Sequence, residues 1–221
     1  MSNMPLTVSV LKEKIAAGHL LKHPFYVDWT NGTLPFENLR HYAQQYFAHV
    51  RAFPVYLSTM HSRCANLDTR QVIAGNLADE EATIPTHPQL WLDFAAGLGL
   101  TRESVLSATP GPRMAALVDT FRAVAGMETG LAVAGLYCYE SQIPAVASAK
   151  IAGLKSNYGV DNAATLRYFQ VHESADVEHS ARWEAVLRDA DIEPRAAAEI
   201  ADWTLGALWS ALDEVYERRA A

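Results

Sequence analysis

The sequence predicts an all-α fold, a helical bundle of about seven to eight helices forming one domain over residues 1–221. Half of the residues are hydrophobic, alanine is abundant, and apolar side chains recur at helical spacing. Glycine and proline cluster at residues 97–99 and 110–112, as expected for short connections. No segment alternates apolar and polar residues as a half-buried strand does. We therefore expect helices throughout, without a second domain.

Start and stop signals divide the N-terminal half into segments. Gly18 is expected to end the first helix, and Asn31-Gly32 forms a turn after the second. Leu34-Pro35 precedes a longer helix, in which we expect a kink at Pro54 because proline has no N–H for the Val50 carbonyl. Asn66 has the position of a cap for the next helix. The expected helices are residues 7–17, 23–29, 36–63 and 67–81.

In the C-terminal half, Pro85 and Pro88 bracket a break before the helical pattern resumes at Trp91. Gly126 stops a later helix, and Asp161-Asn162 caps the helix that carries the main motif described below. The expected helices are residues 91–95, 101–108, 114–125, 128 to about 158, 162–189, and 194 to about Arg219.

Composition excludes several classes of function. The net charge of −7 and the absence of a basic run argue against nucleic-acid binding. No stretch reaches the ~18–20 apolar residues of a membrane span, and residues 1–5 do not resemble a signal peptide, so we expect a cytoplasmic protein. Cys64 and Cys138 are too few for a disulfide framework. We expect reduced structural thiols, with a nucleophilic Cys138 as the alternative.

The main motif is an H-x3-D-x2-H run formed by His172, Asp176 and His179. On a helix, Asp176 and His179 lie about 40° and 20° to either side of His172, so the three side chains share one face. That face is otherwise apolar, since it continues through Tyr168 and Trp183. A bound cation would compensate the cost of burying these groups. The alternative is a set of hydrogen-bonded core residues, but the spacing favours a metal site.

A second segment offers Glu80 and His87, which would share a helical face at seven-residue spacing. Pro85 lies between them and makes the intervening geometry uncertain. Glu81 is the alternative inward carboxylate, and the spacing favours Glu80.

The third segment contains Glu140, whose helical face also carries apolar residues and should point inward. Pro144 cannot bond the Glu140 carbonyl, so the helix is loosened where a ligand would be aimed. The alternative is a lone glutamate solvated at the kink, which the inward-facing position disfavours.

Together the three segments supply three carboxylates and three imidazoles. Two divalent ions would leave this set with a net charge of +1, and one ion would leave −1, so charge does not fix the number of ions. Mixed histidine and carboxylate ligands from several helices suit iron or manganese in a dinuclear site, whereas zinc usually takes fewer ligands. The predicted metal ligands are Glu80, His87, Glu140, His172, Asp176 and His179.

These segments also carry a family resemblance. Residues 79–81 with His87, residues 139–142 before Pro144, and the H-x3-D-x2-H run resemble the haem-oxygenase-like di-metal oxidases, whose fold is a TenA/PqqC-like helical bundle. Within them, the chain is most similar to the group of the Chlamydia protein associating with death domains and its bacterial relatives. The match runs in order from His23 to Trp183.

The resemblance implies an O2-dependent p-aminobenzoate synthase for folate biosynthesis, with an Fe/Fe or Fe/Mn pair, an external reductant and a homodimeric state. In that group a tyrosine of the protein gives the ring and a lysine gives the nitrogen. The matching residues are Tyr26 and Lys150, with Tyr42 and Tyr139 as further candidates for ring source or radical relay. From the residues alone, Lys150 would be a surface charge and Tyr26 a core tyrosine.

Two other functions remain open at this stage. The same fold and metals could oxidise an external small molecule such as a fatty acid or an amino acid, whereas cofactorless quinone synthases and thiaminases of this fold would not need six ligands. A different class is a helical interaction module that binds death domains. No sequence feature marks a surface for that role.

Overall fold

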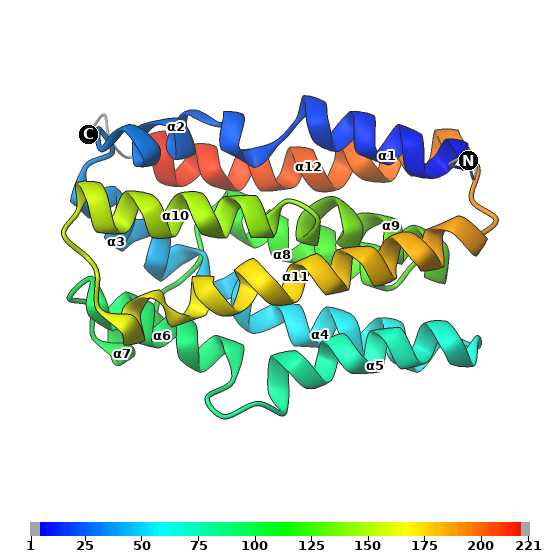
Figure 1. The fold of residues 1–221 in the computed structure, drawn as a ribbon, viewed down its shortest axis with the longest axis horizontal. Helices are drawn as coiled ribbons and strands as arrows, with labels where there is room; N and C mark the ends of the chain where they lie inside the picture. Colours follow the sequence, from blue (N-terminus) through cyan, green and yellow to red (C-terminus); the bar gives the residue numbers. More distant parts are fainter. Residues whose placement is uncertain (1–4, 218–221) are drawn as a thin grey trace.

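The computed structural model describes residues 5–217, which form helices α1 to α12 and one short 3-10 helix, η1, without a strand in that range (Figure 1). The all-α prediction is confirmed, although the helices are more numerous than the seven to eight expected. The expected end near Arg219 lies outside the described residues. The elements are α1 (Leu6–Ala17), η1 (Leu20–Lys22), α2 (Pro24–Asn31), α3 (Phe36–Gln45), α4 (Phe47–Arg63), α5 (Leu67–Glu81), α6 (His87–Gly97), α7 (Arg102–Leu106), α8 (Pro112–Ala125), α9 (Thr129–Glu140), α10 (Ile143–Asn157), α11 (Ala163–Asp189) and α12 (Pro194–Glu217).

Several helix ends lie where the start and stop signals place them. The Asn66 side chain accepts a hydrogen bond from the Thr69 N–H at the start of α5. At the start of α11, the Asn162 side chain accepts a hydrogen bond from the Ala164 N–H. Gly32 ends α2 with a left-handed backbone (φ +71°), a conformation that favours glycine.

The expected single helix over residues 36–63 is wrong, because it divides at Tyr46 into α3 and α4. Pro54 lies inside α4 and does not end it. Tyr46 is buried, its ring packs 5.6 Å from that of Trp91, and its hydroxyl donates to Tyr139 at 3.2 Å. These tertiary contacts hold Tyr46 in place, and they cannot be predicted from the residues next to it in the sequence.

The expected long helix over residues 128–158 is also divided, into α9 and α10. The interruption follows Glu140 and precedes Pro144, where a loosened helix was predicted from the missing proline N–H. Gln142 holds this interruption in place. Its side chain accepts a hydrogen bond from the Leu20 N–H at 2.8 Å and donates one to the Cys138 carbonyl at 2.6 Å.

Helix α6 begins at His87, four residues before the expected restart at Trp91. Thr86 caps it through reciprocal hydrogen bonds with Gln89, and Pro88 occupies the first turn, where its missing N–H costs nothing. The break between α5 and α6 is thus confined to residues 82–86.

Helix α11 crosses the middle of the bundle and packs against α10, α6 and α9 (Figure 1). Helices α2 and α10 approach closely at Gly153, where an added Cβ would lie 2.5 Å from Cδ1 of Trp29. No helix within residues 5–217 is long and apolar enough to cross a membrane.

Candidate metal centre

Helix α11 turns the H-x3-D-x2-H face into the bundle interior. His172, Asp176 and His179 are 7, 4 and 4 % exposed, respectively. The buried rings of Tyr168 and Trp183 lie on the same face. The three polar side chains therefore replace core residues at the centre of the molecule, and they need partners there.

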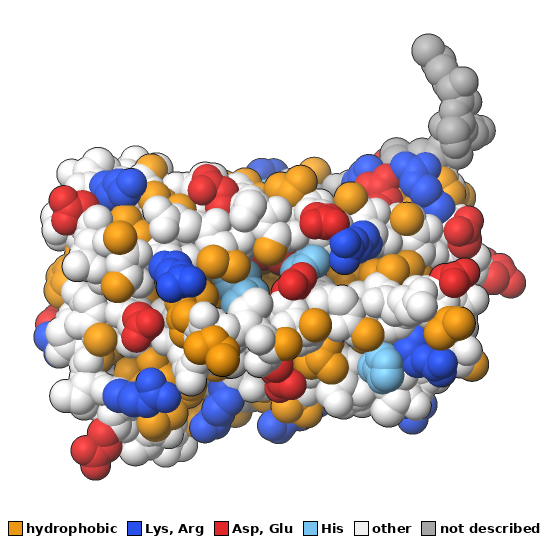
Figure 2. All heavy atoms as spheres, turned by 60° about the horizontal axis from the view of Figure 1, so that its bottom comes forward, with side chains coloured by type: hydrophobic (Ala, Val, Ile, Leu, Met, Phe, Trp, Pro, Cys, Tyr) orange, Lys and Arg blue, Asp and Glu red, His pale blue; other side chains and the backbone are white. Residues whose placement is uncertain are grey.

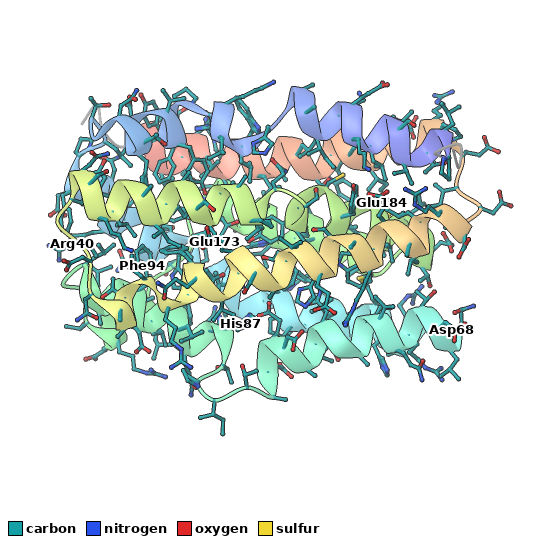
Figure 3. The ribbon with its side chains drawn as sticks, viewed as in Figure 1. Arg40, Asp68, His87, Phe94, Glu173 and Glu184 are labelled. Carbon is teal, nitrogen blue, oxygen red and sulfur yellow. The ribbon has the colours of Figure 1, made fainter. Side chains whose placement is uncertain are left out.

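One partner set consists of Glu80, His87 and His172, which we call the Glu80 triad. Their ligand-type atoms all lie within 4.8 Å of one another. Glu80 lies near the end of α5, and His87 begins α6, facing α11 (Figure 3). The predicted common helical face does not exist, since residues 82–86 separate the two helices, yet the fold brings both side chains together.

Within the Glu80 triad, the imidazole of His172 has a defined tautomer. Its Nδ1 lies 2.7 Å from the Tyr168 carbonyl oxygen, which can only accept, so Nδ1 carries the hydrogen. The lone pair is then on Nε2, 3.9 Å from Oε1 of Glu80. The ring of His87 lies 4.4 Å from that of His172, with its Nδ1 3.0 Å from the same Glu80 oxygen.

The second set, the Glu140 triad, consists of Glu140, Asp176 and His179, whose ligand-type atoms also lie within 4.8 Å of one another. Glu140 ends α9 and is 2 % exposed. Nδ1 of His179 lies 3.2 Å from Asp176, and its Nε2 lies 2.9 Å from Asp79. The two triads share α11, so the six predicted residues form two adjacent groups of three ligand-type side chains.

The ligand-type atoms fit divalent cations. Oδ2 of Asp176 and Nδ1 of His87 are buried and have no hydrogen-bond partner among the described residues. Although His87 lies 3.0 Å from Glu80, the alignment of that contact is too poor for a hydrogen bond. Buried polar atoms without a hydrogen-bond partner are typical of side chains that bind a metal ion.

Without a cation, bound protons compensate the negative charge of the Glu140 triad. Burial, reinforced by the Asp176 charge, raises the pKa of Glu140 to about 8. Burial also raises the pKa of Asp176 to about 6. For His179, burial lowers the pKa, but hydrogen bonds and charges from Asp176, Glu140 and Asp79 outweigh it and raise the pKa to about 9. A divalent cation would take the place of these protons.

Residues around the triads were not predicted from sequence. Asn76 donates to both oxygens of Glu140 at 3.0 and 3.1 Å, and the Trp183 indole donates to Oε2 at 2.6 Å. Asn76 lies one helical turn before Glu80, so a polar residue on that inward face was the available signal. Glu81, the alternative carboxylate, is exposed.

Lys150 and two tyrosines form a second buried cluster. Lys150 is 6 % exposed, and its amine donates a hydrogen bond to the Tyr42 hydroxyl at 2.7 Å. The Tyr42 hydroxyl lies 3.5 Å from that of Tyr26, and the amine lies 5.4 Å from the Tyr26 ring centre. The surface position that local reasoning favoured for Lys150 is wrong, because α10 turns this side chain into the core.

The cluster is continuous with the metal-ligand region through aromatic side chains. The ring of Tyr42 lies 5.0 Å from that of Tyr46, whose hydroxyl donates to Tyr139. Tyr139 directly precedes Glu140. A cavity of about 10 Å³ lies between the Lys150 side and His172, with Trp91 and Tyr168 in its wall.

A second cavity of about 10 Å³ adjoins the ligand-type residues themselves. Its wall contains four ligand-type residues and five others: His49, Val50, Phe53, Glu80, Tyr139, Glu140, Tyr168, His172 and Asp176. Each of these two cavities has room for about one small molecule the size of water. Larger hollows of about 990, 420 and 270 Å³ are lined by none of the six ligand-type residues.

Burial raises the pKa of the Cys138 thiol to about 12, so the structure disfavours the alternative of a nucleophilic cysteine. Cys64 is also buried and forms no disulfide.

On the face in Figure 2, acidic and basic side chains are interspersed, and no continuous basic patch covers its described part.

Comparisons with known proteins agree with this arrangement. Residues 40–210 match the family described as iron-containing redox enzyme. The chain is 42 % identical over 201 residues to the 4-aminobenzoate synthase of Chlamydia trachomatis, covering 88 % of this chain and 87 % of that protein. It is 40 % identical over 221 residues to the 4-aminobenzoate synthase of Nitrosomonas europaea, covering 94 % and 89 %.

Among solved structures, the fold is similar to that of a TenA homologue from Pseudomonas syringae pv. tomato. The TM-score is 0.80 at 13 % identity, and the match covers 98 % of this chain and 95 % of that one. At this identity the similarity concerns the fold alone.

Proposed function

We propose that this chain, which belongs to the haem-oxygenase-like family of iron-containing redox enzymes, is a 4-aminobenzoate synthase that consumes one of its own tyrosines. The resemblance seen in the ligand segments and the TenA-like fold class are confirmed at the level of the family. 4-Aminobenzoate is p-aminobenzoate, a precursor for folate biosynthesis according to the same resemblance. The named relatives support this activity for the chain.

One observation carries the proposal: a buried amine lies against buried phenols beside the ligand-type residues. The Lys150 nitrogen is 2.7 Å from the Tyr42 oxygen, and the Tyr26 oxygen is 3.5 Å farther along. Burial lowers the pKa of Lys150 to about 7. Much of the amine is therefore neutral near pH 7, with the lone pair that transfer of its nitrogen requires. We assign Tyr26 as the ring source and Lys150 as the nitrogen source.

The two triads would hold a pair of ions, two of iron or one of iron and one of manganese, as mixed imidazole and carboxylate ligands favour. When bound, these ions supply the redox chemistry that activates O2, with electrons from an external reductant. The protein's own side chains do the rest. Asn76 and Trp183 orient Glu140, and the Tyr168 carbonyl fixes the His172 tautomer. The aromatic rings around Lys150 exclude water.

The cavity sizes favour an internal substrate over an external one. The two cavities at the ligands hold about 10 Å³ each, which admits a diatomic molecule and not a fatty acid or an amino acid. The ring of Tyr26 is already inside the molecule, 3 % exposed, and needs no entry route.

Isotope labelling tests this function. Protein grown with ring-deuterated tyrosine and 15N-lysine is loaded with iron, or with iron and manganese, and exposed to air with a reductant. We expect 4-aminobenzoate that carries both labels by mass spectrometry, with a matching loss from the mass of the whole chain. Tyr26→Phe and Lys150→Arg should abolish the product, while Tyr216→Phe, a tyrosine bound to Asp28 away from the triads, should retain it.

Unlabelled product formed on addition of a metabolite would instead establish the external substrate. No product from the loaded wild type, or undiminished product from both variants, would refute the proposed synthase. The interaction-module alternative predicts capture of death domains by the metal-free chain without any product.

A further inference from the structure

His49, on α4, is a buried imidazole that the proposed chemistry has not used. It is 0 % exposed and enclosed by the rings of Phe121, Tyr139 and Tyr46 at 4.9, 5.1 and 5.3 Å. Yet it also lines the 10 Å³ cavity that adjoins both triads. A polar ring enclosed by aromatic side chains thus shares a cavity wall with four of the ligand-type residues.

The two nitrogens of His49 differ in their partners. Nδ1 lies 3.4 Å from the Tyr56 hydroxyl, whereas Nε2 is buried and has no hydrogen-bond partner among the described residues. Because Nδ1 is engaged by Tyr56, Nε2 is the polar atom left for the cavity. An unpartnered buried nitrogen destabilises the fold unless a molecule outside the chain completes it.

The hydrogen of His49 can be assigned from its surroundings. Burial lowers the pKa of His49 to about 3, so the imidazole is neutral and carries one hydrogen. Burial also raises the pKa of Tyr56, which keeps its own hydrogen and has no other acceptor for it within residues 5–217. The Tyr56 hydroxyl therefore donates to Nδ1, and the imidazole hydrogen is on Nε2.

We propose that the Nε2–H of His49 is a hydrogen-bond donor to dioxygen in the small cavity beside the two triads, with Tyr56 holding the required tautomer. The cavity volume suits a diatomic molecule, and its remaining wall includes the apolar side chains of Val50 and Phe53. This role rests on the proposed function, since it needs an oxygen-using centre.

Nitric oxide, a diatomic probe of Fe(II), tests the donor without turnover. His49→Leu removes the hydrogen-bond donor, His49→Gln keeps one, and His61→Leu changes a histidine of the same helix outside the cavity wall. At equal iron content, we expect the dissociation constant for nitric oxide to rise about tenfold in His49→Leu, the loss of about one hydrogen bond. It should stay within about threefold in His49→Gln and be unchanged in His61→Leu.

Wild-type binding of nitric oxide by His49→Leu, or equal weakening in His49→Gln, would overturn the proposal. A second measurement uses the unaltered protein, in case His49→Leu does not fold. The N–O stretching band of the bound probe should shift when H2O is exchanged for D2O, and the absence of a shift would also overturn it. Failure of the synthase itself would appear separately, as missing labelled 4-aminobenzoate from wild-type protein that still binds the probe.

Discussion

Lys150 is an amine surrounded by aromatic side chains. Its nitrogen lies 4.9 and 5.0 Å from the ring centres of Tyr42 and Phe169, and no ion pair with a carboxylate is found for it among residues 5–217. Cation–π contacts offset only part of the desolvation of an ammonium. The neutral amine is therefore the form that the fold favours, and this preference makes stability depend on pH.

The direction of that dependence follows from the pKa of Lys150, which is about 7 in the folded chain and near the ordinary lysine value of 10.5 in the unfolded chain. Between these values the unfolded chain binds a proton that the folded chain does not, so stability rises with pH. We expect Lys150→Met to stabilise the metal-free protein by roughly 2 to 5 kcal/mol near pH 7, and by less near pH 9. Urea unfolding across this range measures the difference, and a difference independent of pH would contradict the buried neutral amine.

The two triads should lose their ions separately. Glu80→Ala is expected to lower the metal content from about two ions per chain to about one, since the Glu140 triad keeps all of its ligands. Glu140→Ala should do the same for the other ion. Elemental analysis after removal of weakly bound metal measures the content. Glu81→Ala, at the exposed neighbouring carboxylate, is the control and should retain both ions. Loss of both ions from either single variant would indicate one shared centre instead.

At the scale of elements, local signals located helix starts better than helix interruptions. Asn162 and Pro194 predict the starts of α11 and α12, because a cap and a first-turn proline depend only on residues within one helical turn. The division at Tyr46 was missed because contacts with Trp91 and Tyr139, distant in sequence, determine it. The pair Pro85 and Pro88 predicts a break that includes His87, but Pro88 is favourable in a first turn, so α6 begins at His87.

The packing of α2 on α10 can be tested with one methyl group. Gly153→Ala would place a Cβ 2.5 Å from Trp29, so we expect a loss of roughly 1–3 kcal/mol and displacement of α2, which carries Tyr26. Gly206→Ala, in α12, has no atom within 4 Å of its added Cβ and should gain roughly 0.5–1 kcal/mol. Thermal unfolding measures both, and equal effects of the two changes would contradict the close approach.

Across the whole molecule, residue type, together with helical spacing along α11, predicts six residues that the fold gathers into the two triads, but not the groups that orient them. Trp183 is 43 residues from Glu140, Asn76 is 64, and Asp79 is 100 residues from His179. From the sequence, Trp183 on its apolar stripe is expected to be a core residue, and only the fold shows that its indole donates to Glu140. Such pairings depend on how helices cross, which no helical period encodes.

Because the triads join α5, α6, α9 and α11, bound ions should stabilise the whole fold. Removal of metal is expected to lower the free energy of unfolding by roughly 3–4 kcal/mol per site when the free ion exceeds its dissociation constant by 100- to 1,000-fold. Calorimetry with and without a chelator measures this. A chain with both Glu80→Ala and Glu140→Ala should show no metal-dependent shift. An equal shift in that chain would place the stabilising ions elsewhere.

The proposed role of Tyr26 as ring source would have a consequence for the lifetime of the chain after the reaction. Its ring packs 5.2 Å from Phe25 and 6.4 Å from Trp29, so a chain that gives up this ring keeps a hole in its core. Removing a large aromatic side chain costs about 3–5 kcal/mol, a large part of the ~5–15 kcal/mol that holds a typical domain folded. The spent chain would open more often than the fresh one, exposing it to proteases. On that proposal, loss of the ring would also make used chains more susceptible to degradation than fresh ones.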